Sequence, residues 1–146
     1  MIAEGRSITI LYADDDKDDQ LLVKDALAEA RLANVMHFVD DGEQLMEYLY
    51  NSGKYSNMEK YPRPGLILLD LNMPKKDGRE ALREIKSDPE LRSIPVVVLT
   101  TSKVEEDIIK TYDLGVNSFI IKPVTFNSLV EIVKTLAIYW FDIVKL

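Results

Sequence analysis

Charged and hydroxyl side chains stand at or just beyond the ends of four apolar segments of this chain. Asp14–Asp15 follows one segment, Asp70 another, Thr100 a third and Lys122 a fourth. Carboxylates without a neighbouring histidine or cysteine suit a hard cation, Mg²⁺ before Ca²⁺, and Mg²⁺ usually shares its shell with phosphate oxygens. An aspartate can itself be a nucleophile that forms an aspartyl phosphate. These residue types therefore indicate metal-assisted transfer of a phosphoryl group onto a carboxylate.

A buried strand is needed to deliver Asp70 to such a site. The residues Leu66–Leu69 form a continuous apolar run directly before this aspartate. A run of this kind is typical of a strand that is buried on both faces, so Asp70 is expected at the carboxyl end of a central strand. Open α/β sheets bind their ligands outside that edge.

Short apolar segments alternate with segments whose apolar residues recur at helical spacing. Strands are expected at 7–13, 34–39, 66–70, 95–100 and 118–121, and helices at 18–30, near 45–49, from 77, at 105–114 and from 125 to beyond 140. This alternation predicts an α/β three-layer sandwich around a doubly wound, five-stranded parallel sheet in the order 2-1-3-4-5. In that order the crevice lies between the first and third strands, which brings Asp14, Asp15 and Asp70 together. Thr100 and Lys122 reach the same edge.

Composition narrows the class of protein. The chain has 146 residues, enough for one domain. Its formal net charge of −7 argues against a nucleic-acid partner, because binding to phosphates needs a basic surface. The absence of cysteine excludes disulfides and thiolate metal sites and is compatible with a reducing cytoplasm. No signal peptide and no membrane-spanning run is expected.

The motifs, taken together, resemble the receiver domain of two-component response regulators, whose fold is called flavodoxin-like or CheY-like. The matching residues are Asp14-Asp15, Asp70 with Asn72-Met73-Pro74, Asp77-Gly78, Thr100-Thr101-Ser102, Gly115 and Lys122-Pro123. Each motif alone is common, whereas all of them in this order are specific. The resemblance covers nearly the whole chain and implies a single receiver domain over 1–146, with its core at about 7–141 and no effector domain.

The resemblance implies a role for each carboxylate of the site. Asp70 would accept the phosphoryl group from a histidine of a partner kinase. Asp15 and Asp70 would bind Mg²⁺ directly, together with the backbone carbonyl of Asn72, and Asp14 would act through water.

It also implies roles for residues on the later strands. Lys122 would pair with the phosphoryl group, aimed by a cis peptide before Pro123. Thr100 would move to hydrogen-bond that group, and Phe119 stands where the family has a rotating aromatic switch, although the tyrosine common there carries a hydroxyl. Such a protein contributes to its own phosphorylation and hydrolysis but is not an enzyme acting on an external substrate.

Within the family, the chain looks most like the single-domain regulators that serve bacterial phytochrome-type sensor kinases. The acid-rich start of the first helix, the loop 51–64, the sequence Lys75–Arg79 and the aromatic C-terminal helix carry this finer resemblance. The expected partner is therefore a sensor histidine kinase of phytochrome type. The loop itself is expected to be a solvated insertion, with kinase docking as the alternative, and His37 is expected to be a space-filling residue near the second strand.

The main rival is a phosphohydrolase of the haloacid-dehalogenase type, which also uses an aspartate nucleophile, Mg²⁺, a hydroxyl and a lysine. Asp14-x-Asp16 matches the first-strand signature of those enzymes, whereas Lys17 and the short chain do not. In that reading Asp14, not Asp70, is the nucleophile. A flavodoxin is disfavoured because no hydroxyl-rich phosphate loop follows the first strand, and a receiver that is never phosphorylated is disfavoured because every catalytic position is filled.

The last predicted helix is apolar almost all round from residue 136 onwards, which is unusual for a surface helix of a monomer. Its end is expected to pack against a second copy of the chain, and the alternative is that it folds back over its own core. The residues expected in this dimer interface are Ile138, Tyr139, Phe141 and Ile143.

Overall fold

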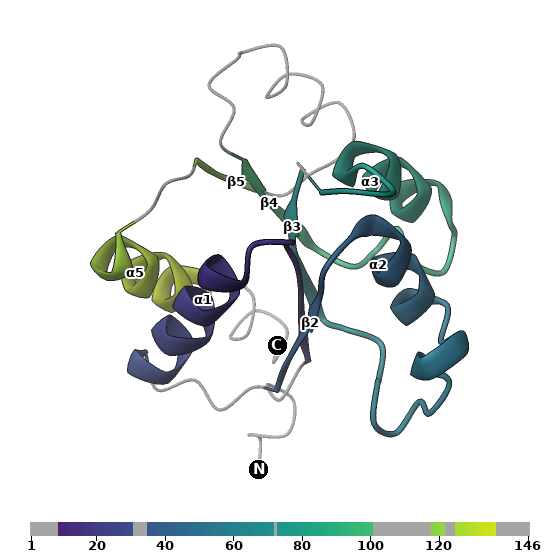
Figure 1. Ribbon diagram of the computed structural model, residues 1–146, viewed down its shortest axis with the longest axis horizontal. Helices are drawn as coiled ribbons and strands as arrows, with labels where there is room; N and C mark the ends of the chain where they lie inside the picture. Colours follow the sequence, from purple (N-terminus) through teal and green to yellow (C-terminus); the bar gives the residue numbers. More distant parts are fainter. Residues whose placement is uncertain (1–8, 31–34, 72, 101–117, 122–124, 137–146) are drawn as a thin grey trace.

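The sheet has the predicted strand order. The computed structural model describes residues 9–30, 35–71, 73–100, 118–121 and 125–136. They form one parallel sheet in the order β2-β1-β3-β4-β5, with helices on both faces (Figure 1). The strands are β1 (Ile10–Ala13), β2 (Met36–Val39), β3 (Leu66–Asp70), β4 (Val96–Thr100) and β5 (Ser118–Ile121).

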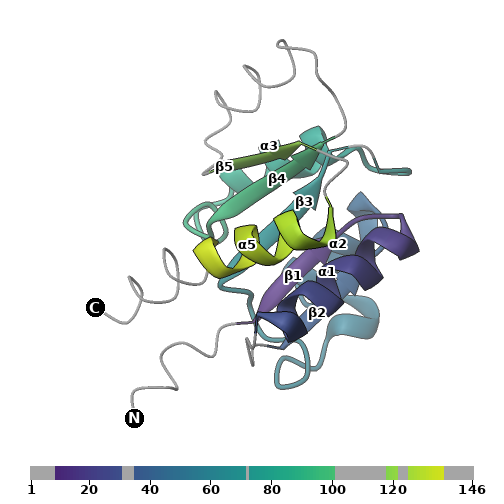
Figure 2. The ribbon, with the colours of Figure 1, turned by 90° about the vertical axis from the view of Figure 1, so that its left-hand side faces the viewer.

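The described helices cover the sheet in two pairs, which makes the predicted three-layer sandwich. On one face α1 and α5 lie side by side, and α2 and α3 cover the other face (Figure 2). The helices are α1 (Lys17–Glu29), α2 (Gly42–Leu49), α3 (Gly78–Ser87) and α5 (Phe126–Leu136). Among the described residues, none of these helices combines the length and apolarity that a membrane span requires. The helix expected at 105–114 and the apolar end of the last helix lie outside the described residues.

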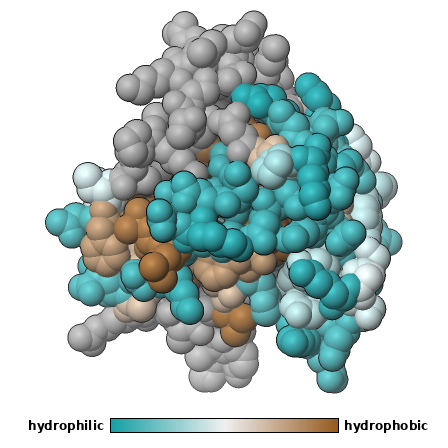
Figure 3. Space-filling model, in the orientation of Figure 1, coloured by the Kyte–Doolittle hydropathy of each residue, from teal (hydrophilic) through white to brown (hydrophobic). Residues whose placement is uncertain are grey.

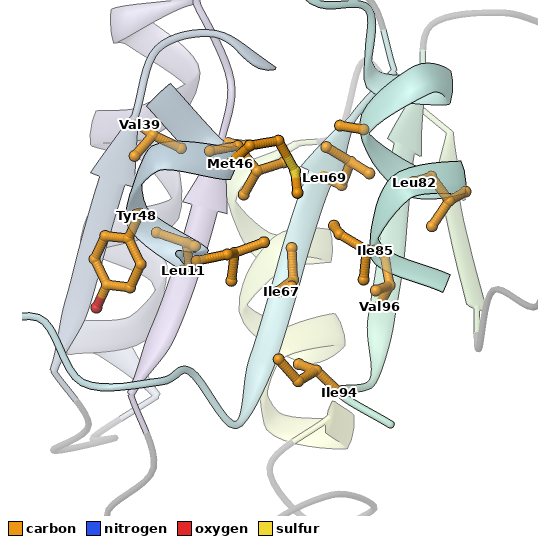
Figure 4. Close-up of a cluster of buried hydrophobic side chains, with 14 of the residues drawn as sticks. Leu11, Val39, Met46, Tyr48, Ile67, Leu69, Leu82, Ile85, Ile94 and Val96 are labelled. Carbon is orange, nitrogen blue, oxygen red and sulfur yellow. The ribbon is translucent and has the colours of Figure 1, made fainter. Parts of the chain in front are cut away.

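Alternation along the buried strands divides the core into two layers. Successive side chains of a strand point to opposite faces, so Leu11 and Ile67 contribute to the layer under α2 and α3 (Figure 4). Tyr12 and Leu68, one residue further on, contribute to the layer under α1 and α5. Both faces of the strands are therefore buried, which explains why the strands read as continuous apolar runs.

Three helices begin at an aspartate on the edge of the sheet where the strands end. Asp16 accepts from the backbone N–H groups of the second and third residues that follow it, Asp41 caps α2, and Asp77 caps α3. A carboxylate at this position satisfies a helical N–H that has no intrahelical partner and interacts favourably with the helix dipole. The acids at this edge thus have two different tasks, because some start helices and others are available to a ligand.

The segment between α2 and β3 is mostly exposed, as expected for a solvated insertion, but aromatic side chains anchor it to the sheet. A short 3₁₀ helix, Gly53–Tyr55, turns the Tyr55 ring into the core, where it contacts Tyr48 and Tyr61 at centroid distances of 5.3 and 5.0 Å. His37 of β2 packs against Tyr48 and Tyr61 at 5.7 and 5.3 Å. These four rings, called the aromatic cluster below, hold the loop against the sheet. His37 fills space as expected, and it does so within this cluster.

Candidate functional site

The structure brings the three predicted carboxylates together. Asp14 and Asp15 directly follow β1 and Asp70 ends β3, and these two strands pair in register so that Ala13 lies opposite Leu69. One carboxylate oxygen from each acid lies within 4.8 Å of the others. Asp14 and Asp70 are buried and Asp15 is exposed, so the group opens to solvent on one side.

This donor set fits a hard divalent cation. Carboxylate oxygens at such separations repel one another, and burying two of them is costly unless positive charge arrives. Three oxygen donors from a partly open cluster leave positions for water and phosphate oxygens, which is how Mg²⁺ is usually bound. The arrangement is therefore compatible with a metal that bridges the protein and a phosphoryl group.

Hydrogen bonds fix both the side chain and the main chain of Asp14. The Tyr12 hydroxyl donates to Asp14 Oδ2 at 2.5 Å, and the backbone N–H of Asp16 donates to Oδ1 at 2.9 Å. The main chain is fixed as well, since Asp14 N–H donates to the Val39 carbonyl and Gln20 Nε2 donates to the Asp14 carbonyl. Burial, followed by the hydrogen bond to Asp14, raises the pKa of Tyr12, so its phenol remains a protonated donor at neutral pH.

A second, more exposed group of charges joins α1 to the end of β2. Lys17 Nζ contacts Asp40 Oδ1 at 2.6 Å, and Gln20 Nε2 donates to the same oxygen at 2.9 Å. The hydrogen bond from Lys17, and then that from Gln20, lowers the pKa of Asp40. Gln20 contacts both Asp40 and the Asp14 carbonyl, so it ties the turn after β1 to the turn after β2.

The turn after β3 is fixed by close backbone packing. Gly78 N–H donates to the Leu71 carbonyl at 3.1 Å, and a Cβ placed on Gly78 would lie 2.5 Å from the Asp70 carbonyl oxygen. Only glycine permits α3 to begin so close to the strand that carries Asp70. Within the same turn, before Gly78, Lys75 has a φ of 66°, and its Nζ lies 3.7 Å from a carboxylate oxygen of the buried Asp41.

The remaining predicted site residues are described only in part. The backbone of Thr100 ends β4 opposite Ile121, and Phe119 of β5 lies opposite Val98, so both strands reach the edge where β3 ends. Asn72 and Lys122 lie outside the described residues, as do the four expected dimer-interface residues. The roles expected for all of these side chains stay predictions.

Two residues of the site were not anticipated. Tyr12 lies two residues before Asp14, so strand alternation puts both side chains on the same side of the sheet, and that spacing is a signal in the sequence. Gln20 has no such signal, because its contact with Asp40 joins elements whose relative placement only the fold determines.

Comparison with known proteins identifies the class of protein that this fold and site define. The family model described as "Response regulator receiver domain" matches residues 10–134. The chain therefore belongs to the response regulator receiver family. The hydrolase alternative is not favoured, and Asp14, its predicted nucleophile, is buried and hydrogen-bonded through both carboxylate oxygens.

Relatives narrow the similarity further. Response regulator Rcp1 from Synechocystis sp. is 44% identical over 137 residues, which span 94% of this chain and 91% of that protein. The phosphorylated cyanobacterial phytochrome response regulator RcpA superposes with a TM-score of 0.82 at 48% identity, covering 91% of this chain and 93% of that one. The Mn²⁺-bound form of Rcp1 superposes with a TM-score of 0.81 at 43% identity, covering 92% and 95%.

Proposed function

We propose that this chain is a stand-alone response regulator that accepts a phosphoryl group on Asp70 from the histidine of a sensor kinase, with Mg²⁺ as its cofactor. The observation that carries the proposal is the convergence of Asp14, Asp15 and Asp70 within 4.8 Å at the end of the central strand of a receiver fold. The Mn²⁺-bound form of the relative Rcp1 supports a divalent cation at such a site.

The chemistry is nucleophilic attack by a carboxylate. An Asp70 oxygen attacks the phosphorus of a phosphohistidine, the P–N bond breaks, and its electron pair returns to the imidazole of the kinase. Asp15, Asp70 and the Asn72 carbonyl would hold Mg²⁺, with Asp14 acting through water. A bound Mg²⁺ would offset the negative charge that gathers on the carboxylates and the phosphoryl oxygens.

Residues at the ends of β4 and β5 complete the proposal. Lys122 would pair with a phosphoryl oxygen, and Thr100 and Phe119 would change their positions when Asp70 is phosphorylated. Output then passes through altered protein contacts. The chain would not turn over an external substrate. We place it in the cytoplasm and expect no nucleic-acid partner, since its net charge is −7.

Intact-mass spectrometry after incubation with acetyl phosphate and Mg²⁺ tests the acceptor. The wild type should gain the mass of one phosphoryl group, and Asp70→Asn should gain none. Asp16→Asn is the matched control, because this exposed acid caps α1 and is not one of the three clustered acids, so it should be phosphorylated like the wild type. A wild type without added mass would refute the proposal, and loss of labelling in Asp14→Asn with labelling kept in Asp70→Asn would favour the hydrolase chemistry.

A phytochrome-type sensor kinase is the proposed partner, by similarity to Rcp1 and RcpA. Apolar surface for a protein partner gathers over α1 and α5 (Figure 3), where Leu21 and Phe126 are 57% and 37% exposed. Phosphotransfer from a phytochrome-type kinase should be faster than from an unrelated histidine kinase. Equal rates from the two kinases would contradict this partner.

The proposed oligomer is a homodimer formed through Ile138, Tyr139, Phe141 and Ile143. Its support is the apolar sequence of the chain end, which a second copy would cover. Sedimentation of the wild type should give the mass of a dimer, and the double variant Tyr139→Glu/Phe141→Glu should give that of a monomer. The same mass for both would favour a chain end that folds over its own core.

A further inference from the structure

Tyr12 reaches from the hydrophobic core to the edge of the cluster formed by Asp14, Asp15 and Asp70. Its side chain is completely buried in the layer under α1 and α5, where the ring meets Phe38 edge-on at a centroid distance of 6.1 Å. The hydroxyl emerges from this apolar layer at the carboxylate of Asp14. A buried phenol normally has a hydrogen-bond partner, and here the partner is one of the three acids of the proposed metal site.

The bond limits how the Asp14 carboxylate can turn. Tyr12 Oη donates to Oδ2 at 2.5 Å, and the Asp16 N–H donates to the other oxygen, Oδ1, at 2.9 Å. The backbone cannot swing to compensate, because the Asp14 N–H and carbonyl are bound to Val39 and Gln20. Because each oxygen already accepts one of these hydrogen bonds, presenting both oxygens of Asp14 to one ion would compete with the Tyr12 bond.

We propose that Tyr12 is a positioning residue that sets the preference of the site for Mg²⁺ over Ca²⁺. The inference rests on the proposed metal site and concerns which ion that site takes. Ca²⁺ binds six to eight oxygens in flexible geometry and often takes carboxylates in bidentate fashion, whereas Mg²⁺ keeps several waters and needs few carboxylates. Asp14 already offers one oxygen to the cluster, and its two hydrogen bonds hinder the bidentate binding that Ca²⁺ would use and that Mg²⁺ does not need.

If the hydrogen bond between Tyr12 and Asp14 had only a structural role, a different result would be expected. If the hydroxyl only satisfies a buried polar group, its removal lowers stability and changes the affinities for both ions by the same factor. If it restrains Asp14, its removal changes the ratio of the two affinities. The ratio is thus the quantity to measure.

The test is isothermal titration of Mg²⁺ and of Ca²⁺ into the full chain carrying Tyr12→Phe. Phenylalanine keeps the buried ring and removes only the donor. The ratio of the Mg²⁺ dissociation constant to that of Ca²⁺ should rise by roughly fivefold to tenfold, the equilibrium equivalent of one hydrogen bond. Tyr48→Phe is the matched control, since Tyr48 is an equally buried tyrosine whose hydroxyl donates to the Pro62 carbonyl in the other layer. Its ratio should equal that of the wild type.

The outcomes separate this inference from the proposed function. A wild type that binds neither ion would overturn the metal site itself. Mg²⁺ binding by the wild type with an unchanged ratio in Tyr12→Phe would overturn the role of Tyr12 and leave the metal site intact.

A second measurement does not depend on the folding of Tyr12→Phe. Added Mg²⁺ should perturb the tyrosine absorption of the wild type, because charge on Asp14 faces the Tyr12 hydroxyl, and Tyr48→Phe should show the same perturbation. A wild-type spectrum that is indifferent to saturating Mg²⁺ would contradict the inference.

Discussion

Among the described residues, each face of the sheet has a tyrosine that is at most 1% exposed, and the hydroxyls of these two tyrosines donate to different targets. Under α1 and α5, Tyr12 donates to Asp14, one of the three clustered acids. Under α2 and α3, Tyr48 donates to the Pro62 carbonyl in the loop before β3. The same residue type at the same degree of burial thus joins the core to the site on one side and to a surface loop on the other.

This difference indicates that the two layers support different parts of the molecule. The layer under α2 and α3 includes Tyr48 (Figure 4) and continues outward through the aromatic cluster, so it holds the long loop. The layer under α1 and α5 meets the site through side chains that lie two residues before its acids, Tyr12 before Asp14 and Leu68 before Asp70. A truncation in the layer under α2 and α3 should lower only the free energy of unfolding. A truncation in the layer under α1 and α5 should lower it and also change the site.

Two leucine truncations test this division most strongly. Leu82→Ala, on α3, and Leu68→Ala, on β3, should each lower the free energy of unfolding by about 2–5 kcal/mol, because both leave a cavity in a packed layer. Only Leu68→Ala should also weaken Mg²⁺ binding. Urea unfolding and calorimetric titration measure the two effects, and weaker Mg²⁺ binding in Leu82→Ala would break the comparison.

A glycine at the start of α2 gives the next largest effect. A Cβ on Gly42 would lie 2.1 Å from the Lys76 carbonyl oxygen, so Gly42→Ala should cost about 1–3 kcal/mol or more of unfolding free energy through overpacking. Gly53→Ala is the control, since nothing lies within 4 Å of its added Cβ and only its φ of 59° is unfavourable. Thermal unfolding should rank Gly42→Ala below Gly53→Ala, and the reverse order would mean that backbone strain outweighs the clash.

The half-buried Asn51 anchors the loop through its side-chain amide. Its Nδ2 donates to the carbonyls of Tyr55 and Tyr61 at 3.1 and 2.9 Å, and its φ is 52°. Asn51→Ala should cost about 1–2 kcal/mol, because it loses hydrogen bonds and places alanine in the left-handed region. Asn51→Gly loses the same bonds without the backbone strain and should be the more stable of the two by chemical denaturation. Equal stabilities would show that the strain at this position is negligible.

The smallest effect is a pH dependence that originates in the aromatic cluster. Burial lowers the pKa of His37 below its usual value of 6.5, so the unfolded chain binds its proton more tightly than the folded one. The unfolding free energy should therefore decline as the pH falls through about 6.5 and level off below the folded pKa. Asp40 does not interfere, because its hydrogen bonds with Lys17 and Gln20 lower its pKa and so move its titration further from that of histidine.

His37→Gln should flatten this slope between pH 7 and 5 in urea titrations. An unchanged slope would assign the pH dependence to another group.

The elements that the sequence predicted best are those governed by local pattern. The apolar run before Asp70 predicted β3 with its observed ends, and the alternation of strands and helices predicted the order of the sheet. From that order the meeting of Asp14, Asp15 and Asp70 followed directly.

The loop 51–64 and the support of Asp14 were harder to foresee. Tyr55 and Tyr61 lie in a polar segment without periodicity, and their burial depends on His37 and Tyr48, which are distant in the chain. Contacts of this kind follow from three-dimensional packing and leave no local signature. The short spacing between Tyr12 and Asp14 does leave one.

The aromatic cluster also indicates where this chain can be opened without loss of the fold. Met58 is 65% exposed between Tyr55 and Tyr61, and both of these rings are held by Tyr48 rather than by backbone continuity across the tip. Exposed loop tips tolerate new chain ends when their flanks are fixed by packing. A circular permutant opened at Met58 would keep β1 and β3 paired and the three acids together, so the loop offers a site for splitting the protein into two complementing fragments.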